Sequence, residues 1–225
     1  MKYHEKLLPN QKDNSNLFDG DISLFEYEIF ELTKRLIDWE TPEFEHDDKS
    51  QSEMGSSIIL QDFLNLIIML TKSKRVLEIG TFVGMSAIAF ARANVNVDTI
   101  EKYESFATIA RKNIVAAGFT EKIRVLVGNA IEILPKLNDS YDLIFIDGDK
   151  VNYKSYFNLA KRLLSPDGII IVDDLFFHGD VFNSTTKTER GEGVKKLINE
   201  LKEQIKEFRF RVLPISNGVL IAQRR

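Results

Sequence analysis

The stretch Val76-Leu77-Glu78-Ile79-Gly80-Thr81-Phe82-Val83-Gly84-Met85-Ser86 decides the fold of this chain. An apolar run stops at Gly80, small residues follow, and a helical pattern of apolar residues begins at Met85. This order is typical of a buried parallel strand that turns sharply into a helix. Glycines at such a turn let a ligand approach the backbone, and the new helix offers free N–H groups to an anionic group.

An acidic residue follows the next strand-like segment. The run 95–100 is rich in β-branched residues and ends at Glu101. An acid at the tip of the second strand is where a nucleotide-type ligand presents its ribose hydroxyls. A glycine turn alone is common among strand–helix connections, but together with Glu101 it favours a nucleotide-type site.

The remainder of the chain alternates between strand-like and helix-like segments. Alternation of this kind predicts right-handed crossovers and a parallel sheet with helices on both faces. A helix over 192–206 and two apolar runs around Asn217-Gly218 follow, which predicts an antiparallel hairpin. The expected fold class is therefore α/β, with a doubly wound, mostly parallel seven-stranded sheet and one antiparallel strand in a C-terminal hairpin. We expect strands over 75–80, 95–101, 123–128, 141–147, 168–173, 210–215 and 219–222, and helices over 85–93, 105–117, 130–137 and 153–164.

We expect a single domain over 1–225, because 225 residues with 44% hydrophobic content can bury one full core. Its parts would be a loose arm (1–20), N-terminal helices that cover the site (21–71) and a catalytic core (75–225). A capping box starts a helix over 22–39, and a second helix is expected over 53–71. The acidic segment 41–52 between them fits a lid and a solvated linker equally well.

Composition excludes several classes of protein. The formal net charge is −4 and charged residues make up 28%, which indicates a soluble cytoplasmic protein and argues against a nucleic-acid binder. The chain has no cysteine, so disulfides and zinc–thiolate sites are excluded. Since no apolar run reaches the roughly eighteen residues that a membrane span needs, we expect no membrane partner.

Acidic residues follow the fourth and fifth predicted strands. Asp147 opens the sequence Asp-Gly-Asp-Lys, and Asp173 and Asp174 end the next strand. Ligands gather beyond the carboxyl ends of strands in a doubly wound sheet, so these three side chains should meet there. Three adjacent carboxylates repel one another unless a hard divalent cation binds them. A simple turn at Asp147 and a helix cap at the Asp pair are the alternatives.

These segments resemble a known family, the cation-dependent S-adenosylmethionine (SAM) O-methyltransferases, which includes catechol and caffeoyl-CoA enzymes and bacterial relatives. The likeness runs from about residue 54 to the C-terminus and implies a class I methyltransferase, Rossmann-like fold. The segments that carry it are 77–86, Thr99-Ile100-Glu101, Gly128-Asn129-Ala130, 141–150 with Tyr153, and 163–168.

The resemblance implies a role for each of these residues. Lys150 would be the base, with Asp147 beside it, and His178 would contact the substrate, although an ordinary loop histidine would look the same. Mg²⁺, or Mn²⁺ or Ca²⁺ in its place, would be held by Asp147, Asp173 and Asp174. SAM would be bound by Met54, Glu78, Gly80, Thr81, Gly84, Ser86, Glu101, Asn129, Ala130 and Asp147.

The chain departs from the family at two positions. Asn129 stands where the family usually has Asp, so the adenine contact is expected to be neutral. Asp174 stands where the third metal ligand is usually Asn. The extra negative charge should tighten cation binding and leaves the preferred metal open.

The chemistry predicts the reaction. A cation that binds the acceptor oxygens lowers their pKa, and Lys150 can take the proton if the metal lowers its own pKa. Chelation favours two neighbouring oxygens, hence a small catechol-like vicinal diol. One alternative comes from the resemblance: some bacterial members of the family are similar to this chain in length and ending, which implies a tRNA 5-hydroxyuridine O-methyltransferase, for which Arg209, Arg211, Arg224 and Arg225 could form a basic patch. The other alternative is a non-catalytic nucleotide-binding protein. The apolar stripe of helix 22–39 predicts a homodimer.

Overall fold

The computed structural model describes residues 31–32, 35–36 and 55–225. The chain divides into two compact units, 1–40 and 41–225. In the first unit the described residues Glu31, Leu32, Arg35 and Leu36 are helical, within the helix expected over 22–39. The rest of that helix, the arm 1–20, the segment 41–52 and Met54 lie outside the described residues, and the single-domain organisation stays a prediction.

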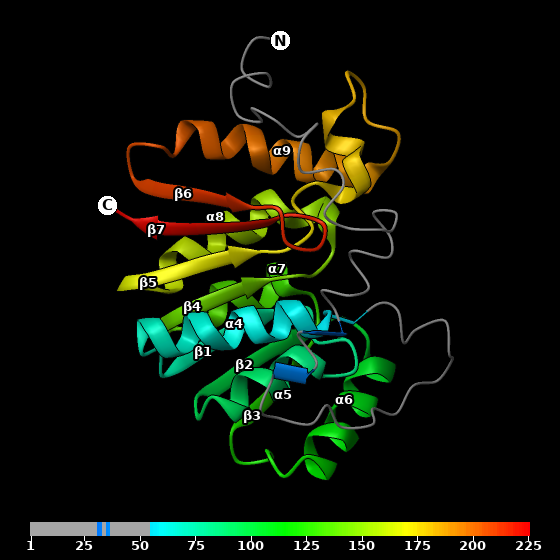
Figure 1. Ribbon diagram of the computed structural model, residues 1–225, viewed down its shortest axis with the longest axis vertical. Coiled ribbons are helices and arrows are strands. Elements are labelled where there is room, and N and C mark those ends of the chain that lie inside the picture. The colour runs from blue at the N-terminus through cyan, green and yellow to red at the C-terminus, as the bar shows by residue number, and fades with distance from the viewer. Residues whose placement is uncertain (1–30, 33–34, 37–54) are drawn as a thin grey trace. The chain divides into compact units, whose positions relative to one another are not determined.

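The second unit is built on a seven-stranded sheet in its described part, with the order β3-β2-β1-β4-β5-β7-β6 (Figure 1). β1 to β5 run parallel, and β7 is antiparallel to both β5 and β6. The predicted fold class is confirmed. The strands are β1 Arg75–Ile79, β2 Asn96–Glu101, β3 Ile123–Val127, β4 Tyr141–Ile146, β5 Leu164–Val172, β6 Phe208–Leu213 and β7 Val219–Arg224.

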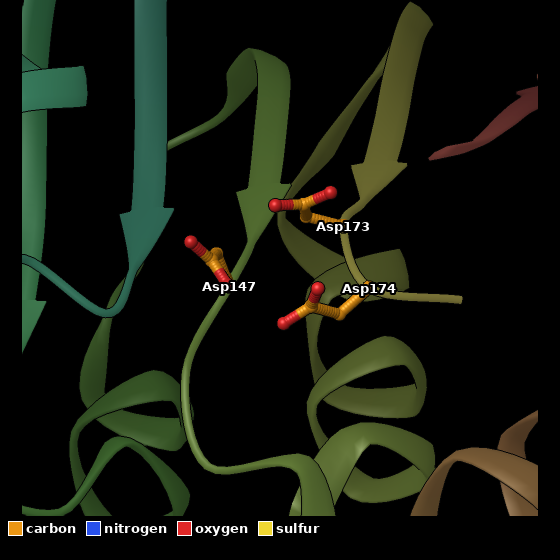
Figure 2. A group of neighbouring side chains, drawn as sticks. All are labelled: Asp147, Asp173 and Asp174. Carbon is orange, nitrogen blue, oxygen red and sulfur yellow. The ribbon is translucent and has the colours of Figure 1, made fainter. Parts of the chain in front are cut away.

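The strand order reverses between β1 and β4, and this reversal positions the site. Chain connections leave β1 and β4 toward opposite sides, so a crevice opens beyond their carboxyl ends. Asp147 directly follows β4, and Asp173 and Asp174 directly follow β5, so that the three side chains come together at this edge (Figure 2).

Helices cover both faces of the sheet (Figure 1). Helices α4, α5 and α6 pack on one face, and α7, α8 and α9 pack on the other. No helix among the described residues is long and apolar enough to cross a membrane. The helices are α4 Ile58–Thr71, α5 Met85–Arg92, α6 Glu104–Ala116, α7 Ala130–Ile133, α8 Tyr153–Leu163 and α9 Glu189–Glu203.

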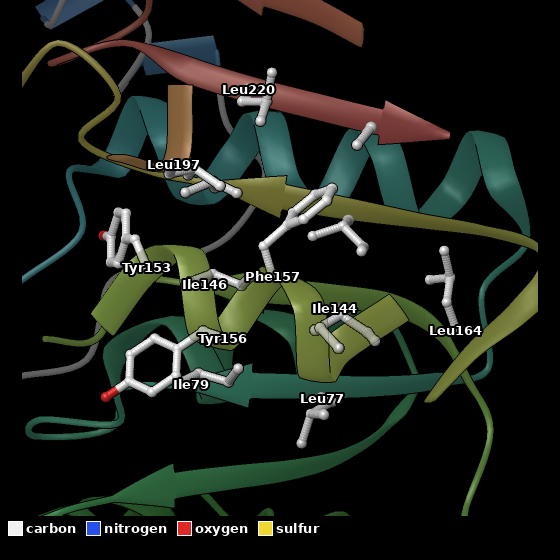
Figure 3. Packing of buried hydrophobic residues seen from close by; sticks show 14 of the residues in the cluster. Leu77, Ile79, Ile144, Ile146, Tyr153, Tyr156, Phe157, Leu164, Leu197 and Leu220 are labelled. Atoms are coloured by element: carbon white, nitrogen blue, oxygen red, sulfur yellow. The ribbon is translucent and has the colours of Figure 1, made fainter. Parts of the chain in front are cut away.

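Two hydrophobic clusters lie on opposite faces of the sheet. Residues 168–172 of β5 are all buried. Ile169 and Ile171 point into the cluster under α4 and α5, while Ile170 and Val172 point into the other. Phe157 of α8 lies at the centre of this second cluster (Figure 3). Strands buried on both faces read as continuous apolar runs, which is why the sequence revealed them.

Element boundaries differ from expectation at several points. Helix α4 begins at Ile58, not at residue 53, because the hydroxyl of Ser57 caps the backbone N–H of Leu60 at 3.2 Å. The expected helix 130–137 is a short α-helix followed by a 3₁₀ helix, Leu134–Lys136, with a proline in its first turn. Strand β5 begins four residues early, and α9 begins at Glu189, where Thr188 caps it.

Candidate active site

The turn after β1 brings the backbone close to the end of β4. Gly80 has φ +105°, and a Cβ atom built there would lie 2.4 Å from the carbonyl oxygen of Asp147. Only glycine fits this approach. Gly84 has φ +91° and precedes α5. A Cβ atom built there would lie 3.4 Å from the Cβ atom of Ala110 on α6. The two glycines shape the turn that the sequence predicted.

Glu78 lies beneath this turn and is fully buried. Its carboxylate accepts hydrogen bonds from the hydroxyls of Ser86 and Thr99, the latter at 2.5 Å. Burial raises the pKa of Glu78 to about 8, against the opposing effect of the two hydroxyl donors. Glu78 therefore holds the first turn of α5 against β1 and β2 and keeps the hydroxyl of Ser86 in place.

Glu101 ends β2 and closes the far side of the turn. Its Oε2 accepts from the backbone N–H of Phe82 at 2.8 Å, and its Oε1 accepts from that of Tyr103 at 2.9 Å. A carboxylate offers about four lone-pair positions, so both oxygens keep capacity for a further donor. This fixed geometry suits a diol that donates two hydroxyl hydrogens.

A cavity of about 910 Å³ joins the glycine turn to the acidic cluster. Three residues expected to bind SAM, namely Glu78, Gly84 and Asn129, do not line it; Asn129 instead caps α7 through Ile131 N at 3.1 Å. A fourth, Met54, lies outside the described residues. The expected site residues that do line the cavity are Gly80, Thr81, Ser86, Glu101, Ala130, Asp147, Lys150, Asp173, Asp174 and His178. Their individual roles stay predictions.

Asp147, Asp173 and Asp174 form a compact acidic cluster (Figure 2). One carboxylate oxygen from each lies within 4.8 Å of the others. The ammonium of Lys150 contacts two of them, with Nζ 2.9 Å from Asp147 Oδ1 and 2.7 Å from Asp174 Oδ2. Lys150 begins the 3₁₀ helix Lys150–Asn152, three residues after Asp147. At this spacing its ammonium group reaches back to the Asp147 carboxylate.

The environment shifts the pKa values of this cluster. Burial, and then the charges of Asp147 and Asp174, raise the pKa of Asp173 to about 8. Burial opposes the charge of Lys150, but the two carboxylates that it contacts outweigh burial and raise its pKa. Without a cation on the carboxylates, Lys150 therefore holds its proton.

The residues present fit a divalent cation. Asp173 Oδ1 is buried and has no hydrogen-bond partner, although a buried polar atom normally has one. The three carboxylates supply oxygen ligands, the type that Mg²⁺, Mn²⁺ and Ca²⁺ prefer. Lys150 satisfies only the other two acids, so the cluster has an open acceptor on its buried side.

Several cavity residues were given no role in the sequence analysis. Phe82, Tyr103 and Phe106 stack edge to face beside Glu101, with ring centroids 4.9 Å (Phe82–Phe106) and 6.1 Å (Tyr103–Phe106) apart. Arg190 on α9 and Ser216 in the β6–β7 hairpin reach the cavity from the C-terminal third of the chain. The β6–β7 hairpin brings Ser216 to the strand ends, and the start of α9 brings Arg190 there.

Comparison with known proteins identifies the family. The family model described as O-methyltransferase matches residues 41–225. The chain therefore belongs to the O-methyltransferase family, as its class I methyltransferase fold and acid-lined strand ends indicate.

Individual relatives differ in how much of the chain they share. Catechol O-methyltransferase of Niastella koreensis is 37% identical over 141 residues, which cover 60% of this chain and 64% of that protein. "Probable caffeoyl-CoA O-methyltransferase 1" of Dictyostelium discoideum is 26% identical over 230 residues, 96% of this chain and 97% of that one. The match thus spans less than two thirds of the Niastella protein and nearly all of the Dictyostelium one.

Solved structures share the fold. An O-methyltransferase from Bacillus cereus in complex with SAH superposes with a TM-score of 0.71 at 26% identity, covering 96% of both chains. TomG from Streptomyces achromogenes, in complex with SAM, gives a TM-score of 0.71 at 26% identity, with 93% of this chain and 92% of TomG covered.

Proposed function

We propose that this protein transfers the methyl group of SAM to a hydroxyl of a small vicinal diol, such as a catechol, with a divalent cation. The proposal rests on one observation: the same cavity is lined by the expected SAM-binding residues Gly80 and Glu101 and by the acidic cluster with Lys150 (Asp147, Asp173, Asp174 and Lys150). Relatives named catechol O-methyltransferase and neighbours solved with SAM or SAH support the same reaction.

The glycine turn and Glu101 would bind the methyl donor. Gly80 lines the cavity, so its backbone is within reach of a ligand there. The carboxylate of Glu101, fixed by two backbone N–H groups, would accept from the ribose hydroxyls. Ser86 and the N-terminus of α5 face the cavity and suit the anionic carboxylate of the amino-acid part.

The acidic cluster would hold the cation and the acceptor. Asp147, Asp173 and Asp174 would be its ligands, and a bound cation supplies positive charge that lowers the pKa of a neighbouring hydroxyl. Lys150 lies at the same carboxylates and would take the proton of that hydroxyl once their charge is neutralised. Orientation of acceptor oxygen against methyl carbon within one cavity would supply much of the remaining rate gain.

The acceptor class can be tested with labelled SAM and saturating Mg²⁺. Parallel reactions should contain catechol, phenol, and bulk tRNA whose wobble uridines carry the 5-hydroxyl group without its methyl group. We expect label in catechol and none in phenol or tRNA, because only the vicinal diol can chelate the cation. Label in tRNA without label in catechol would favour the tRNA-modifying alternative, and equal labelling of phenol would contradict chelation by two oxygens.

A further inference from the structure

A residue of the C-terminal hairpin contacts the acidic cluster. Asn217 lies at the tip of the β6–β7 hairpin, 43 residues after Asp174. Its Nδ2 donates to Asp174 Oδ1 at 3.1 Å, and its Oδ1 accepts from the backbone N–H of His178 at 2.8 Å. The amide thus joins a candidate metal ligand to the loop that follows it.

The orientation of the Asn217 amide is fixed by its partner. A backbone N–H can only donate, so the oxygen of Asn217 must face His178 and its NH₂ group must face Asp174. Two backbone bonds lock the hairpin tip in this place, from Leu175 N to Gly218 O at 2.9 Å and from Phe176 N to Asn217 O at 2.8 Å. The position opposite Asn217 therefore requires an acceptor.

The second carboxylate oxygen of Asp174 must also act as an acceptor, here toward Lys150. Its Oδ2 faces Lys150 Nζ at 2.7 Å and belongs to the group that would hold the cation. Its backbone φ of +56° lies in the left-handed region, which Asp and Asn tolerate better than other residues with a side chain. The same short side chain must therefore accept from the hairpin and present an oxygen to the cluster.

An asparagine at position 174 cannot do both. If its oxygen faced the cluster, its NH₂ would face the NH₂ of Asn217; if it turned round, it would present a donor to a cation. Only a carboxylate accepts on both sides. We infer that Asn217 is a positioning residue that orients Asp174 for cation binding, and that this hydrogen-bond polarity is why a carboxylate stands at position 174.

The inference predicts that the pair can be exchanged. In Asp174→Asn/Asn217→Asp, the new carboxylate at 217 accepts from His178 N and from the new amide at 174, whose oxygen then faces the cluster. The net charge is unchanged. The single variants each place two like groups against one another: two donors in Asp174→Asn and two acceptors in Asn217→Asp.

The experiment is a double-mutant cycle on the full chain, with Mn²⁺ affinity from isothermal titration calorimetry as the readout. We expect Asn217→Asp to weaken Mn²⁺ binding by roughly tenfold in the wild-type background and to strengthen it in the Asp174→Asn background. Charge alone predicts stronger binding in both backgrounds, because the substitution adds a carboxylate. Stronger binding of Mn²⁺ by Asn217→Asp itself would overturn the inference.

A control variant separates a specific effect on the acidic cluster from a general loss of stability. Asn183→Asp alters another Asn–Asp pair, Asn183 Nδ2 to Asp180 Oδ1 at 3.0 Å, outside the cluster. It should lower the melting temperature and change Mn²⁺ affinity by less than about twofold.

The part of the inference that concerns cation binding rests on the proposed function. The hydrogen-bond pairing of Asn217 with Asp174 does not. In EDTA, Asn217→Asp should lower the melting temperature of the wild type and raise that of Asp174→Asn. If the wild type bound no Mn²⁺, the proposed metal site would be wrong. Opposite changes in melting temperature in the two backgrounds would still support the pairing of Asn217 with Asp174. Additive melting temperatures would overturn the pairing whatever the metal result.

Discussion

Gly80 and Asp147 are in such close contact that a Cβ atom on the first would lie 2.4 Å from the carbonyl oxygen of the second. The backbone N–H of Asp147 also donates to the carbonyl of Ile79 at 2.9 Å. The turn expected to bind SAM and the first candidate metal ligand therefore form one rigid junction between β1 and β4.

This junction predicts that Gly80→Ala damages both binding sites at once. The methyl group would meet backbone that cannot move aside, and φ +105° is unfavourable for alanine. We expect a loss of stability together with weaker binding of both SAM and Mn²⁺, measured by thermal melting and by calorimetry. Gly118→Ala is the matched control, because Gly118 has φ +77° but open space around it. It should lower stability alone, and equal ligand losses in both variants would contradict the junction.

Glu101→Gln should weaken SAM binding. The substitution removes the charge that would accept the ribose hydroxyls and turns an NH₂ toward one of the backbone N–H groups of Phe82 and Tyr103. Hydrogen bonds to a charged group are worth enough to predict a loss of roughly 10- to 100-fold in SAM affinity by calorimetry, with a lower melting temperature. Glu104→Gln, at an exposed residue of the next helix, should leave SAM affinity as in the wild type. Unchanged affinity of Glu101→Gln would remove Glu101 from the cofactor site.

Asp180 should make stability depend on pH in the acid range. Its carboxylate accepts from Lys187 N, from the hydroxyl and N–H of Thr188 and from Asn183, and these bonds lower its pKa to about 2. A depressed pKa in the folded state stabilises the protein above the unfolded pKa of about 4, and this stabilisation is lost as the pH falls through about 2.

Comparing the wild type with Asp180→Asn by urea denaturation measures this contribution. The stability advantage of the wild type should be constant above pH 5 and should shrink between about pH 4 and pH 2. A difference that stays constant down to pH 2 would show that the carboxylate charge of Asp180 is not what orders the segment 183–188.

Asp98 should stabilise the fold without serving the site. It is buried on β2 and accepts from Tyr141 Oη at 2.6 Å and from Arg124 Nε at 2.7 Å. Asp98→Ala leaves the buried hydroxyl of Tyr141 unpaired and should cost about 1 to 3 kcal/mol in the free energy of unfolding, with unchanged Mn²⁺ affinity. Asp139→Asn, which affects the half-exposed pairs with Arg75 at 2.9 Å and with Arg124 at 3.6 Å, should cost less than about 1 kcal/mol. Equal losses in thermal melting would refute the buried network.

The sheet could be predicted from sequence because its strands are buried on both faces and its helices separate them regularly. The grouping of Asp147 with Asp173 and Asp174 followed from topology alone, since the carboxyl ends of adjacent parallel strands meet. The side chains that orient these groups could not be predicted. Asn217 reaches Asp174 only through the register of an antiparallel hairpin, and a local sequence pattern contains no information about that register.

Not every residue that the family resemblance assigns to SAM lines the cavity, and the assignment of Glu78 and Asn129 to SAM stays a prediction. Glu78 and Asn129 belong to the quoted motifs, yet one lies buried beneath the cavity and the other caps α7. A motif fixes the path of the backbone, but whether a side chain faces ligand or core depends on neighbours such as Thr99, which come from other strands.

The decisive measurement is the initial rate of methyl transfer from SAM to catechol as a function of Mg²⁺ concentration, after exhaustive dialysis against EDTA. We predict no turnover without cation, saturable recovery with Mg²⁺ or Mn²⁺, and almost no activity for Asp147→Asn at any concentration, because Asp147 contacts Lys150 and belongs to the candidate ligand group. A full rate in the metal-free protein would contradict the role assigned to the three carboxylates.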